Sequence, residues 1–422
     1  MERMRTGKGA THRFATLAAR DLATVQVAHL KTRFELAERS LLAERAVALV
    51  NEAFADYEAK HNIIRVKPGE LVVEHSGEKL LLPLLETHWV ARLARDMSLL
   101  EVKRQHEHDQ YCQLQKVDPE ATYGDLWRLL GRESQVKRRA PKGYDFLPEE
   151  PQPHTAVPLL PRMPQDMEAV PEPVMTAVTE ILANDYGCKP ARAEAMIKAI
   201  AGIRAWCCPK ITELAPGQMV WLAHCIRKTR RTDPKLFVPV ILTVVTLDEQ
   251  GKTFSHRGEF KRAKVAQIER ITTEAWRQDG VLTNSDVEWL TGLTPNVIRE
   301  LLEAYQEKFG IILPTAGTVL DMGRPLTHKK LVVEMALGGM TTREIARRIY
   351  HTPEAVDAYL RTFDKLLILR YYGLPIGAMV RVLGHGRKLI EEHLALADKH
   401  FPTADDLKAY LTGRGVSLEN IC

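Results

Sequence analysis

Apolar residues in the first part of the chain recur at every third or fourth position, the spacing that buries one face of an α-helix. Between residues 12 and 60 they include, with no proline among them, Phe14, Leu17, Leu22, Val25, Leu41, Leu42, Ala46 and Leu49. The pattern predicts helices over residues 12–60. A similar pattern predicts a second helical stretch over about residues 84–116.

The segment between these stretches alternates short apolar, β-branched runs with turn residues. Three such runs, between residues 63 and 82, are separated by Pro68-Gly69 and Ser76-Gly77. Because Pro-Gly and Ser-Gly pairs mark tight turns, this pattern predicts a small antiparallel meander. The meander and the helices around it form a predicted helical N-terminal domain, residues 1–140.

Nine prolines lie between residues 141 and 173. Proline has no backbone N–H and a fixed φ, so this density excludes both helix and central strand. We therefore interpret residues 141–173 as an extended linker. It marks the clearest domain boundary in the chain.

The predicted middle domain, residues 174–279, combines helices with one apolar β-branched run. Helical patterns cover residues 174–184 and 190–203, and helix resumes over about 262–278. Residues 236–247 are rich in valine and isoleucine, which favours a buried strand or strand pair. The fold class predicted for the whole chain is mainly α with small β elements.

From residue 280 to about 400 the chain is helical and repeats itself. Residues 282–302 align without a gap with residues 340–360, and residues 374–394 form a third copy. In the second copy, Ala346 allows close helix approach, while Thr352 and Pro353 form a favoured N-cap and first-turn pair. Two short helices joined by a tight turn are typical of the helix-turn-helix. The sequence thus predicts a tandem helix-turn-helix C-terminal region, residues 280–400, followed by a C-terminal tail, residues 401–422.

The second copy resembles the helix-turn-helix of response-regulator output domains and of sigma-factor region 4. More widely, residues 313–329, running into the repeats, resemble an uncharacterised prokaryotic family known only as a domain of unknown function. This second resemblance is best over residues 310–396 and extends from residue 215 onward. It implies helix-turn-helix units and no established activity. A basic residue usually stands in that family where this chain has Ala316, which puts a phosphate contact at that position in doubt.

Charge changes the picture only when it is resolved along the chain. The 422 residues include 59 Lys+Arg and 54 Asp+Glu, a net charge of +5 that permits a nucleic-acid partner without demanding one. Residues 189–264 hold 15 Lys+Arg against 6 Asp+Glu, so the remainder is net acidic. Aromatic residues make up 6%, which argues against a stacking platform for single strands. Duplex DNA is the predicted partner.

The repeats supply most of the candidate DNA contacts. The third copy begins its second helix with a basic turn suited to phosphate or guanine contact, whereas Glu354 and Asp357 oppose binding in the second copy. The candidates in the three copies, in chain order, are Asn296, Arg299, Arg343, Arg347, Arg361, His385, Arg387 and Lys388. The alternative is that copies one and two are scaffold or bind another protein.

Two further basic segments are candidate phosphate contacts. One is the helix start Thr327, His328 and Lys329, and the other is a run on an expected hairpin loop, formed by Arg227, Lys228, Arg230 and Arg231. Solvated charges on a capped helix and on a loop remain the alternative for each.

Other functional classes find little support in the sequence. No apolar run reaches the 18 residues that a membrane span needs, and no signal peptide is predicted. Six cysteines in so long a chain are no disulfide framework, which indicates a reducing cytoplasm. Cys207-Cys208 and His224-Cys225 lack the usual zinc spacing, as do His106 and His108 on one helix. We expect no metal site, no cofactor and no catalytic residue.

The sequence therefore predicts a cytoplasmic, sequence-specific duplex DNA-binding protein, a transcriptional regulator that acts through helix-turn-helix units. The N-terminal helical domain is a candidate homodimer contact. One alternative is a transposase- or recombinase-like protein of a mobile element, with acids such as Asp233, Asp248 and Glu259 converging in space. The other is a protein-interaction scaffold that binds no DNA.

Overall fold

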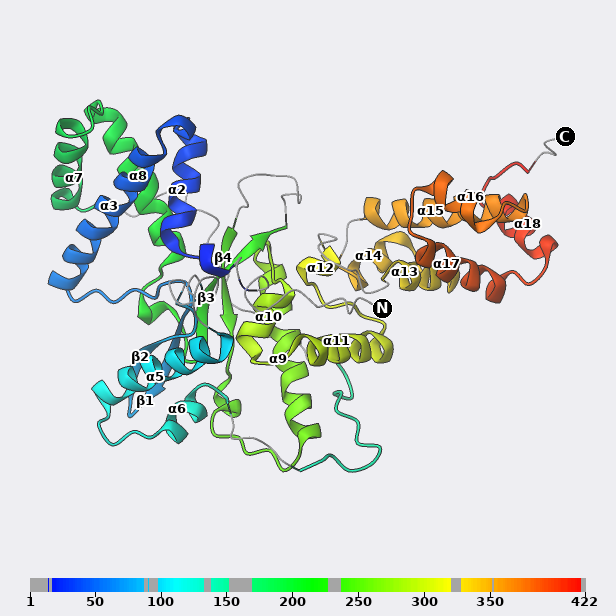
Figure 1. The fold of residues 1–422 in the computed structure, drawn as a ribbon, viewed down its shortest axis with the longest axis horizontal. Helices are drawn as coiled ribbons and strands as arrows, with labels where there is room; N and C mark the ends of the chain where they lie inside the picture. Colours follow the sequence, from blue (N-terminus) through cyan, green and yellow to red (C-terminus); the bar gives the residue numbers. More distant parts are fainter. Residues whose placement is uncertain are drawn as a thin grey trace, which may run out of the picture. The chain divides into compact units, whose positions relative to one another are not determined.

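A computed structural model describes Phe14, Val90 and residues 17–86, 98–132, 138–151, 169–226, 237–319, 328–350 and 353–418. These residues are mainly helical with a small antiparallel sheet, which confirms the predicted fold class. The chain divides into two compact units, Met1–Leu301 and Leu302–Cys422. Figure 1 shows the elements of each unit along the chain. Among the described helices, none combines the length and apolar character that crossing a membrane requires.

The sheet lies in the first unit and unites segments that are far apart in sequence. The described strands are β1 (Glu70–His75), β2 (Glu78–Pro83), β3 (Gln218–Cys225), β4 (Phe237–Thr243) and β5 (Gly280–Val281). Their order is β2-β1-β3-β4, with β5 also paired to β3, and every pair is antiparallel.

The β1–β2 hairpin forms from the second and third runs of the predicted meander, whereas in the first run only Arg65 pairs, through an isolated bridge with Lys210. The turn of the hairpin explains why it is so clearly marked in the sequence. His75 faces Glu78, so only Ser76 and Gly77 form the turn. Both have positive φ, 52° and 82°, as the favoured two-residue hairpin turn requires. Strand β1 also pairs with β3 at Leu71 and Met219, so strands from the predicted N-terminal and middle domains share one sheet.

Helix α9 (Arg257–Arg277) packs against β4 and completes its hydrogen bonding. The side chain of Gln278, just after α9, accepts from the Ile241 N–H and donates to the Ile241 carbonyl, both at 2.8 Å. The Glu274 carboxylate accepts from the Thr243 N–H at 2.7 Å. Backbone groups of β4 are therefore paired with side chains, which buried polar groups require.

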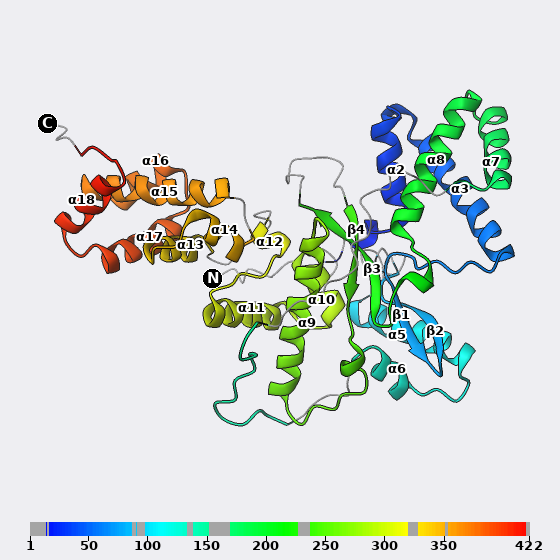
Figure 2. The same cartoon turned by 180° about the vertical axis from the view of Figure 1, so that it is seen from behind.

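A four-helix bundle forms a second core of the first unit, seen from behind in Figure 2. It contains α2 (Leu22–Arg33), α3 (Ser40–Lys60), α7 (Glu172–Asn184) and α8 (Pro190–Cys207). Two of these helices precede the proline-rich segment and two follow its main part. Residues 152–168 of the predicted linker lie outside the described residues.

Two more helices of this unit, α5 (Leu99–Val117) and α6 (Tyr123–Leu129), contact each other, and α5 also packs on β2. Each begins with a capping box: Ser98 with Glu101 for α5, and Thr122 with Asp125 for α6. In such a box the hydroxyl and the carboxylate each accept a backbone N–H that the first turn leaves unpaired. Both helix starts are thus set locally by the sequence.

The second unit is helical in its described residues. After α11 (Pro295–Phe309), which crosses the division between the units, it contains α12 (Ala316–Val319), α13 (His328–Leu337), α14 (Thr342–Arg348), α15 (Pro353–Tyr371), α16 (Ile376–Leu383), α17 (Arg387–His400) and α18 (Ala404–Gly413).

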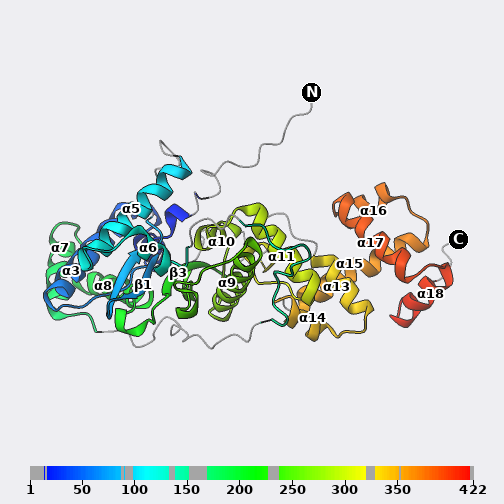
Figure 3. The same ribbon diagram turned by 90° about the horizontal axis from the view of Figure 1, so that it is seen from below.

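Helix α15 is central to this unit, because it contacts α13, α14, α16, α17 and α18 (Figure 3). Val356, Leu360 and Phe363 on α15 are buried at the predicted spacing. Within the predicted tail, α18 contributes Leu407 and Leu411 to the same core.

Candidate nucleic-acid interface

The three sequence repeats each form a pair of helices. The pairs are α10 (Asn284–Thr291) with α11, α14 with α15, and α16 with α17. Thr283 and Thr341 cap the first helices of copies one and two through capping boxes with Asp286 and Glu344. The helices therefore begin where the repeat pattern predicts them. A helix-turn-helix mode of DNA docking stays a prediction.

Copy one is built into the core of the first unit. Asp286 of α10 is fully buried, and its carboxylate lies 2.5 Å from Nη1 of Arg20, which is equally buried. The Trp289 indole N–H donates to the Leu84 carbonyl at 2.7 Å. Helix α10 thus faces protein on several sides, which leaves the exposed Asn296 and Arg299 of α11 as the candidate contacts.

In copy two the candidate cations are exposed to solvent, and one acid is hydrogen-bonded within the protein. Arg343 and Arg347 on α14 and Arg361 on α15 are exposed. The Asp357 carboxylate accepts a hydrogen bond from the Thr342 hydroxyl at 3.0 Å. This bond joins α15 to α14, so Asp357 has a structural role that the sequence pattern did not indicate.

Copy three carries two strongly exposed cations. The Arg387 and Lys388 side chains are 74% and 87% exposed in the first turn of α17. Their partners are acids one turn further along the helix, Glu391 at 2.8 Å and Glu392 at 3.8 Å. Such solvent-exposed pairs contribute about 0–1 kcal/mol, so exchange for a phosphate partner costs little.

The fold brings two separately predicted candidates, Lys329 and His385, close together. Burial, and then the positive charge of Lys329, lower the pKa of His385. Lys329 lies over the Tyr359 ring, with Nζ 5.3 Å from the ring centroid. Helices α13 and α17 contact each other, which explains how residues 56 positions apart meet. Thr327 lies outside the described residues, and for His328 only its place in α13 is described.

Beneath these residues lies His393, which sequence reasoning missed. It is 1% exposed, stands edge-on to the Phe363 ring, and neither ring nitrogen has a hydrogen-bond partner among the described residues. Burial, with smaller effects from His385 and Lys329, lowers the pKa of His393 to about 4. It is therefore neutral at pH 7. The only sequence signal was its apolar spacing on α17.

Four of the described helices in the second unit begin in two contrasting ways. Helices α14 and α18 begin with a threonine cap and an acid, Glu344 or Asp406, in the first turn. Helices α13 and α17 have no acid in the first turn, where the sequence places His-Lys-Lys and Arg-Lys-Leu. Since a helix N-terminus carries partial positive charge, the first arrangement is stabilising and the second is not.

The cations of the basic segment, residues 189–264, fall into two groups. The run Arg227, Lys228, Arg230 and Arg231 lies outside the described residues. Elsewhere in the segment, cations are used inside the first unit: Arg204 donates to the buried Glu58 at 2.5 Å, and Lys264 is buried. Part of the excess positive charge that the sequence suggested for DNA binding is therefore buried inside the first unit.

The candidate metal and catalytic residues take other roles where they are described. The Glu259 carboxylate accepts from the Ser255 N–H and hydroxyl at 2.7 and 2.6 Å, and Asp233 lies outside the described residues. Burial raises the pKa of the Cys208 thiol to about 12 and that of Cys207 well above its usual value. No group of three or more His, Cys, Asp or Glu in the described part of the chain is arranged to hold a metal ion.

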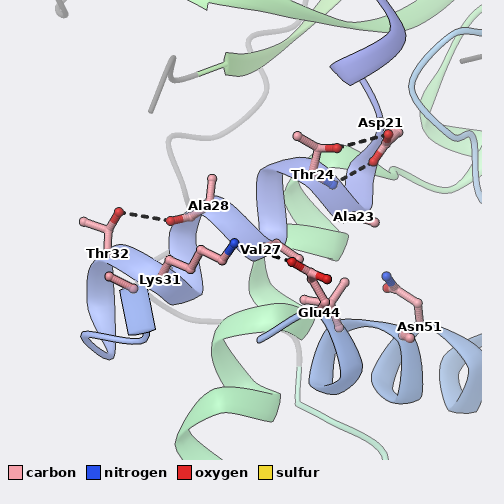
Figure 4. Close-up of a pocket in the computed structure, with 12 residues that line it drawn as sticks. Asp21, Ala23, Thr24, Val27, Ala28, Lys31, Thr32, Glu44 and Asn51 are labelled. Carbon is pink, nitrogen blue, oxygen red and sulfur yellow. Dashed lines mark hydrogen bonds and ion pairs between the residues drawn. The ribbon is translucent and has the colours of Figure 1, made fainter. Parts of the chain in front are cut away.

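An open hollow of about 970 Å³ lies between α2 and α3 of the predicted N-terminal domain. Figure 4 shows Lys31 and Glu44, 3.5 Å apart, reaching across it from the two helices. The apolar part of its lining consists of small side chains, namely Ala23, Val27, Ala28, Ala37, Val47 and Ala48.

A smaller cavity of about 280 Å³, which we call the α6 pocket, also escaped sequence analysis. It lies between α6 and the segment that joins β4 to α9. The local signal was the tripeptide Gly251-Lys252-Thr253, which combines a permissive backbone with two anion-binding side chains but is not a complete phosphate-loop motif.

Comparison with known proteins gives one match. The model of a family described as "Protein of unknown function (DUF1670)" matches residues 182–396, which include β3, β4 and all three repeats. Neither the curated proteins nor the solved structures contain a match.

Proposed function

The chain belongs to the DUF1670 family of proteins of unknown function, and we propose that it is a sequence-specific duplex DNA-binding protein, a transcriptional regulator that uses its C-terminal helix pairs. The observation that carries this proposal is the pair of cationic helix starts. Lys329 at the start of α13 and Arg387 and Lys388 at the start of α17 come from two sequence segments that the fold packs together.

The unfavourable placement of these cations is itself an argument for a ligand. A cation in the first turn opposes the helix dipole by roughly 0.3–1 kcal/mol. A phosphate at the same place would meet the helix dipole and the cationic side chains together. In the absence of an anion, Arg387 and Lys388 interact unfavourably with the dipole of their own helix, and a duplex supplies phosphates at regular spacing.

The remaining candidates would then position the duplex. Arginine at a helix N-terminus has the reach to contact guanine O6 and N7 in the major groove, as Arg387 would. Exposed side chains on the other helix pairs would contact sugar and phosphate groups, which fixes register without reading sequence. These side chains are Asn296, Arg299, Arg343, Arg347 and Arg361.

Fluorescence anisotropy with labelled duplexes tests the proposal. We expect binding to weaken steeply with salt. The Arg387→Ala/Lys388→Ala variant should lower the log–log salt slope by about one through the lost phosphate contact of Lys388, and should lose specificity through the lost guanine contact of Arg387. Arg361→Ala is the matched control and has a smaller effect, because its guanidinium Nε already donates to the carbonyl of Asp357.

The proposal is wrong if no duplex changes the anisotropy at low salt, or if the double variant binds as tightly as the parent protein. Sequencing of DNA fragments that co-purify with the protein, with bare resin as control, tests sequence specificity. Mg²⁺-dependent nicking of bound DNA would instead favour the mobile-element enzyme. A stable protein complex free of nucleic acid would favour the scaffold.

The same proposal includes a cytoplasmic homodimer joined through the N-terminal helical domain. The hollow between α2 and α3 supports this part, since small side chains allow another helix to approach closely. Light scattering on the full chain tests it, and a monomer at micromolar concentration would remove this part without affecting DNA binding.

A further inference from the structure

The α6 pocket has the chemical lining of an anion site. Its volume of about 280 Å³ lies just below the range of about 300–1,000 Å³ that is typical of small-molecule sites. The residues that line it are Gly124, Trp127, Arg128, Gly131, Arg132, Glu249, Gly251, Lys252 and Thr253. Three cations, one acid, one hydroxyl, one indole and three glycines therefore face one small cavity.

Glycine allows the two walls of the pocket to approach each other. Gly251 has φ +73°, and a Cβ at this position would lie 3.2 Å from Cδ of Arg128 on the opposite wall. Gly131 has φ +58°, and its Cβ would lie 3.2 Å from Val245. Both positions combine a left-handed backbone with tight packing, so a side chain at either one would be strained.

Three acids at or near the pocket already have an ion-pair or hydrogen-bond partner in the protein. Glu249 accepts from Nη1 and Nη2 of Arg270 at 3.0 and 2.8 Å. Asp125 lies 3.3 Å from Arg128. Glu107 accepts the indole N–H of Trp127 at 2.6 Å, which holds the ring in place at the wall.

A further cation lies buried behind this lining. Lys264 is 8% exposed and donates to the amide oxygen of Gln267 at 2.8 Å, a neutral partner. Burial, and then the charges of Arg132 and Arg270, lower the pKa of Lys264 to about 8, with Glu249 acting in the opposite direction. The five cations Arg128, Arg132, Lys252, Lys264 and Arg270 exceed the three acids Asp125, Glu107 and Glu249 by two charges.

We propose that the α6 pocket binds a small phosphorylated metabolite. Its phosphate would lie among Arg132, Lys252 and the Thr253 hydroxyl, and its organic part would lie against the Trp127 ring. A phosphate dianion matches the excess of two positive charges, and its oxygens match the fork of an arginine and the point charge of a lysine. The pocket is independent of the helix starts assigned to DNA, so this site goes beyond the proposed function.

Isothermal titration calorimetry on the full chain tests the site. The probes are ribose 5-phosphate and glucose 6-phosphate, with ribose and glucose as matched neutral controls and inorganic phosphate as the headgroup alone. We expect the sugar phosphates to bind, the neutral sugars to show no binding, and inorganic phosphate to bind more weakly than the esters.

Lys252→Met is the first variant, because Lys252 is exposed and its loss leaves the core intact. We expect it, and Arg132→Ala, to weaken sugar-phosphate binding about tenfold or more. Lys198→Met, an exposed lysine on α8, is the matched control and binds as the parent does. A circular dichroism melt of each variant separates lost binding from lost folding.

Three results would overturn the proposal. One is the absence of binding by either sugar phosphate. Another is unchanged affinity in the folded Lys252→Met and Arg132→Ala variants. The third is displacement of the sugar phosphate by duplex DNA in a variant with intact Arg132, which would assign the pocket to the nucleic-acid surface. None of these bears on the Arg387→Ala/Lys388→Ala experiment, so the two proposals fail separately.

Discussion

At the scale of single residues, the ionisable groups inside this protein decide how it responds to pH. His393 is the clearest case, because it is buried against Phe363 and both of its ring nitrogens lack a partner among the described residues. Protonation there would place a charge beside Lys329 and His385 in a site that offers it no acceptor. The neutral imidazole is therefore part of the folded state of the second unit.

We predict that the second unit loses stability as the pH falls from about 6.5 to 4. The pKa of His393 is about 4 in the folded protein and about 6.5 when unfolded, so the unfolded chain binds more protons in this window. The free energy of unfolding should fall by about 3 kcal/mol, in full only near pH 4. Calorimetric melts of the full chain between pH 7 and 4 measure it.

His393→Leu should reduce this pH dependence, since it removes the titrating group from a buried apolar site. His400→Leu is the control, because His400 is exposed in the last turn of the same helix. Equal pH slopes for both variants and the parent would show that His393 does not cause the effect.

At the scale of elements, the helix starts of the second unit differ in whether the first turn holds an acid or a cation. Thr341 accepts the Glu344 N–H, and Glu344 accepts the N–H and hydroxyl of Thr341. These bonds lower the pKa of Glu344, because they favour its charged form. The start of α14 is thus stabilised by its own side chains. The first turn of α17 has the cations Arg387 and Lys388 instead of an acid.

We predict that Thr341→Ala lowers the free energy of unfolding by about 1 kcal/mol and leaves duplex binding nearly unchanged. The reason is that the capping hydroxyl satisfies the Glu344 N–H and is not among the proposed DNA contacts. Urea unfolding and anisotropy measure the two effects. Thr412→Ala, an exposed threonine within α18, should change neither, and a loss of DNA affinity in Thr341→Ala would contradict the division of roles.

Much of this local level could be predicted from the sequence, because its signals are local. Ser76-Gly77 marks the hairpin turn and Pro353 the start of α15, and both are found where expected. The proximity of Lys329 to His385 could not be predicted, since it depends on how α13 packs on α17. The α6 pocket was missed for the same reason: Arg132 and Lys264 meet only through tertiary structure.

At the scale of the whole molecule, buried charges tie distant segments of the first unit together. Arg20 precedes α2, donates to the Leu222 carbonyl of β3 at 2.9 Å, and pairs with Asp286 of α10. Burial raises the pKa of Asp286, although Arg20 acts in the opposite direction. The pair therefore holds the segment before α2, strand β3 and helix α10 together, and each charge depends on the other.

We predict that Arg20→Met destabilises the first unit by roughly 3–5 kcal/mol, because it leaves the Asp286 carboxylate buried without its cation. The double variant Arg20→Met/Asp286→Asn should recover part of this loss, since no unpaired charge remains. Urea unfolding of both variants provides the measurement. A double variant less stable than Arg20→Met would mean that the ion pair is not the source of the loss.

The pairing of β1 with β3 has a consequence for how the protein is made. Strand β1 ends at His75, but its partner β3 begins only at Gln218. Helices α2 and α3 likewise pack on helices α7 and α8, which are synthesised much later. At the usual speed of synthesis, the missing partners emerge on the order of ten seconds later. A two-stranded hairpin is marginal alone, so the N-terminal segment leaves the ribosome with its apolar face uncovered. The first unit can therefore complete its fold only after the ribosome has synthesised the proline-rich segment and the partner elements that follow it. Until then, the uncovered apolar face is accessible to chaperones and to other nascent chains.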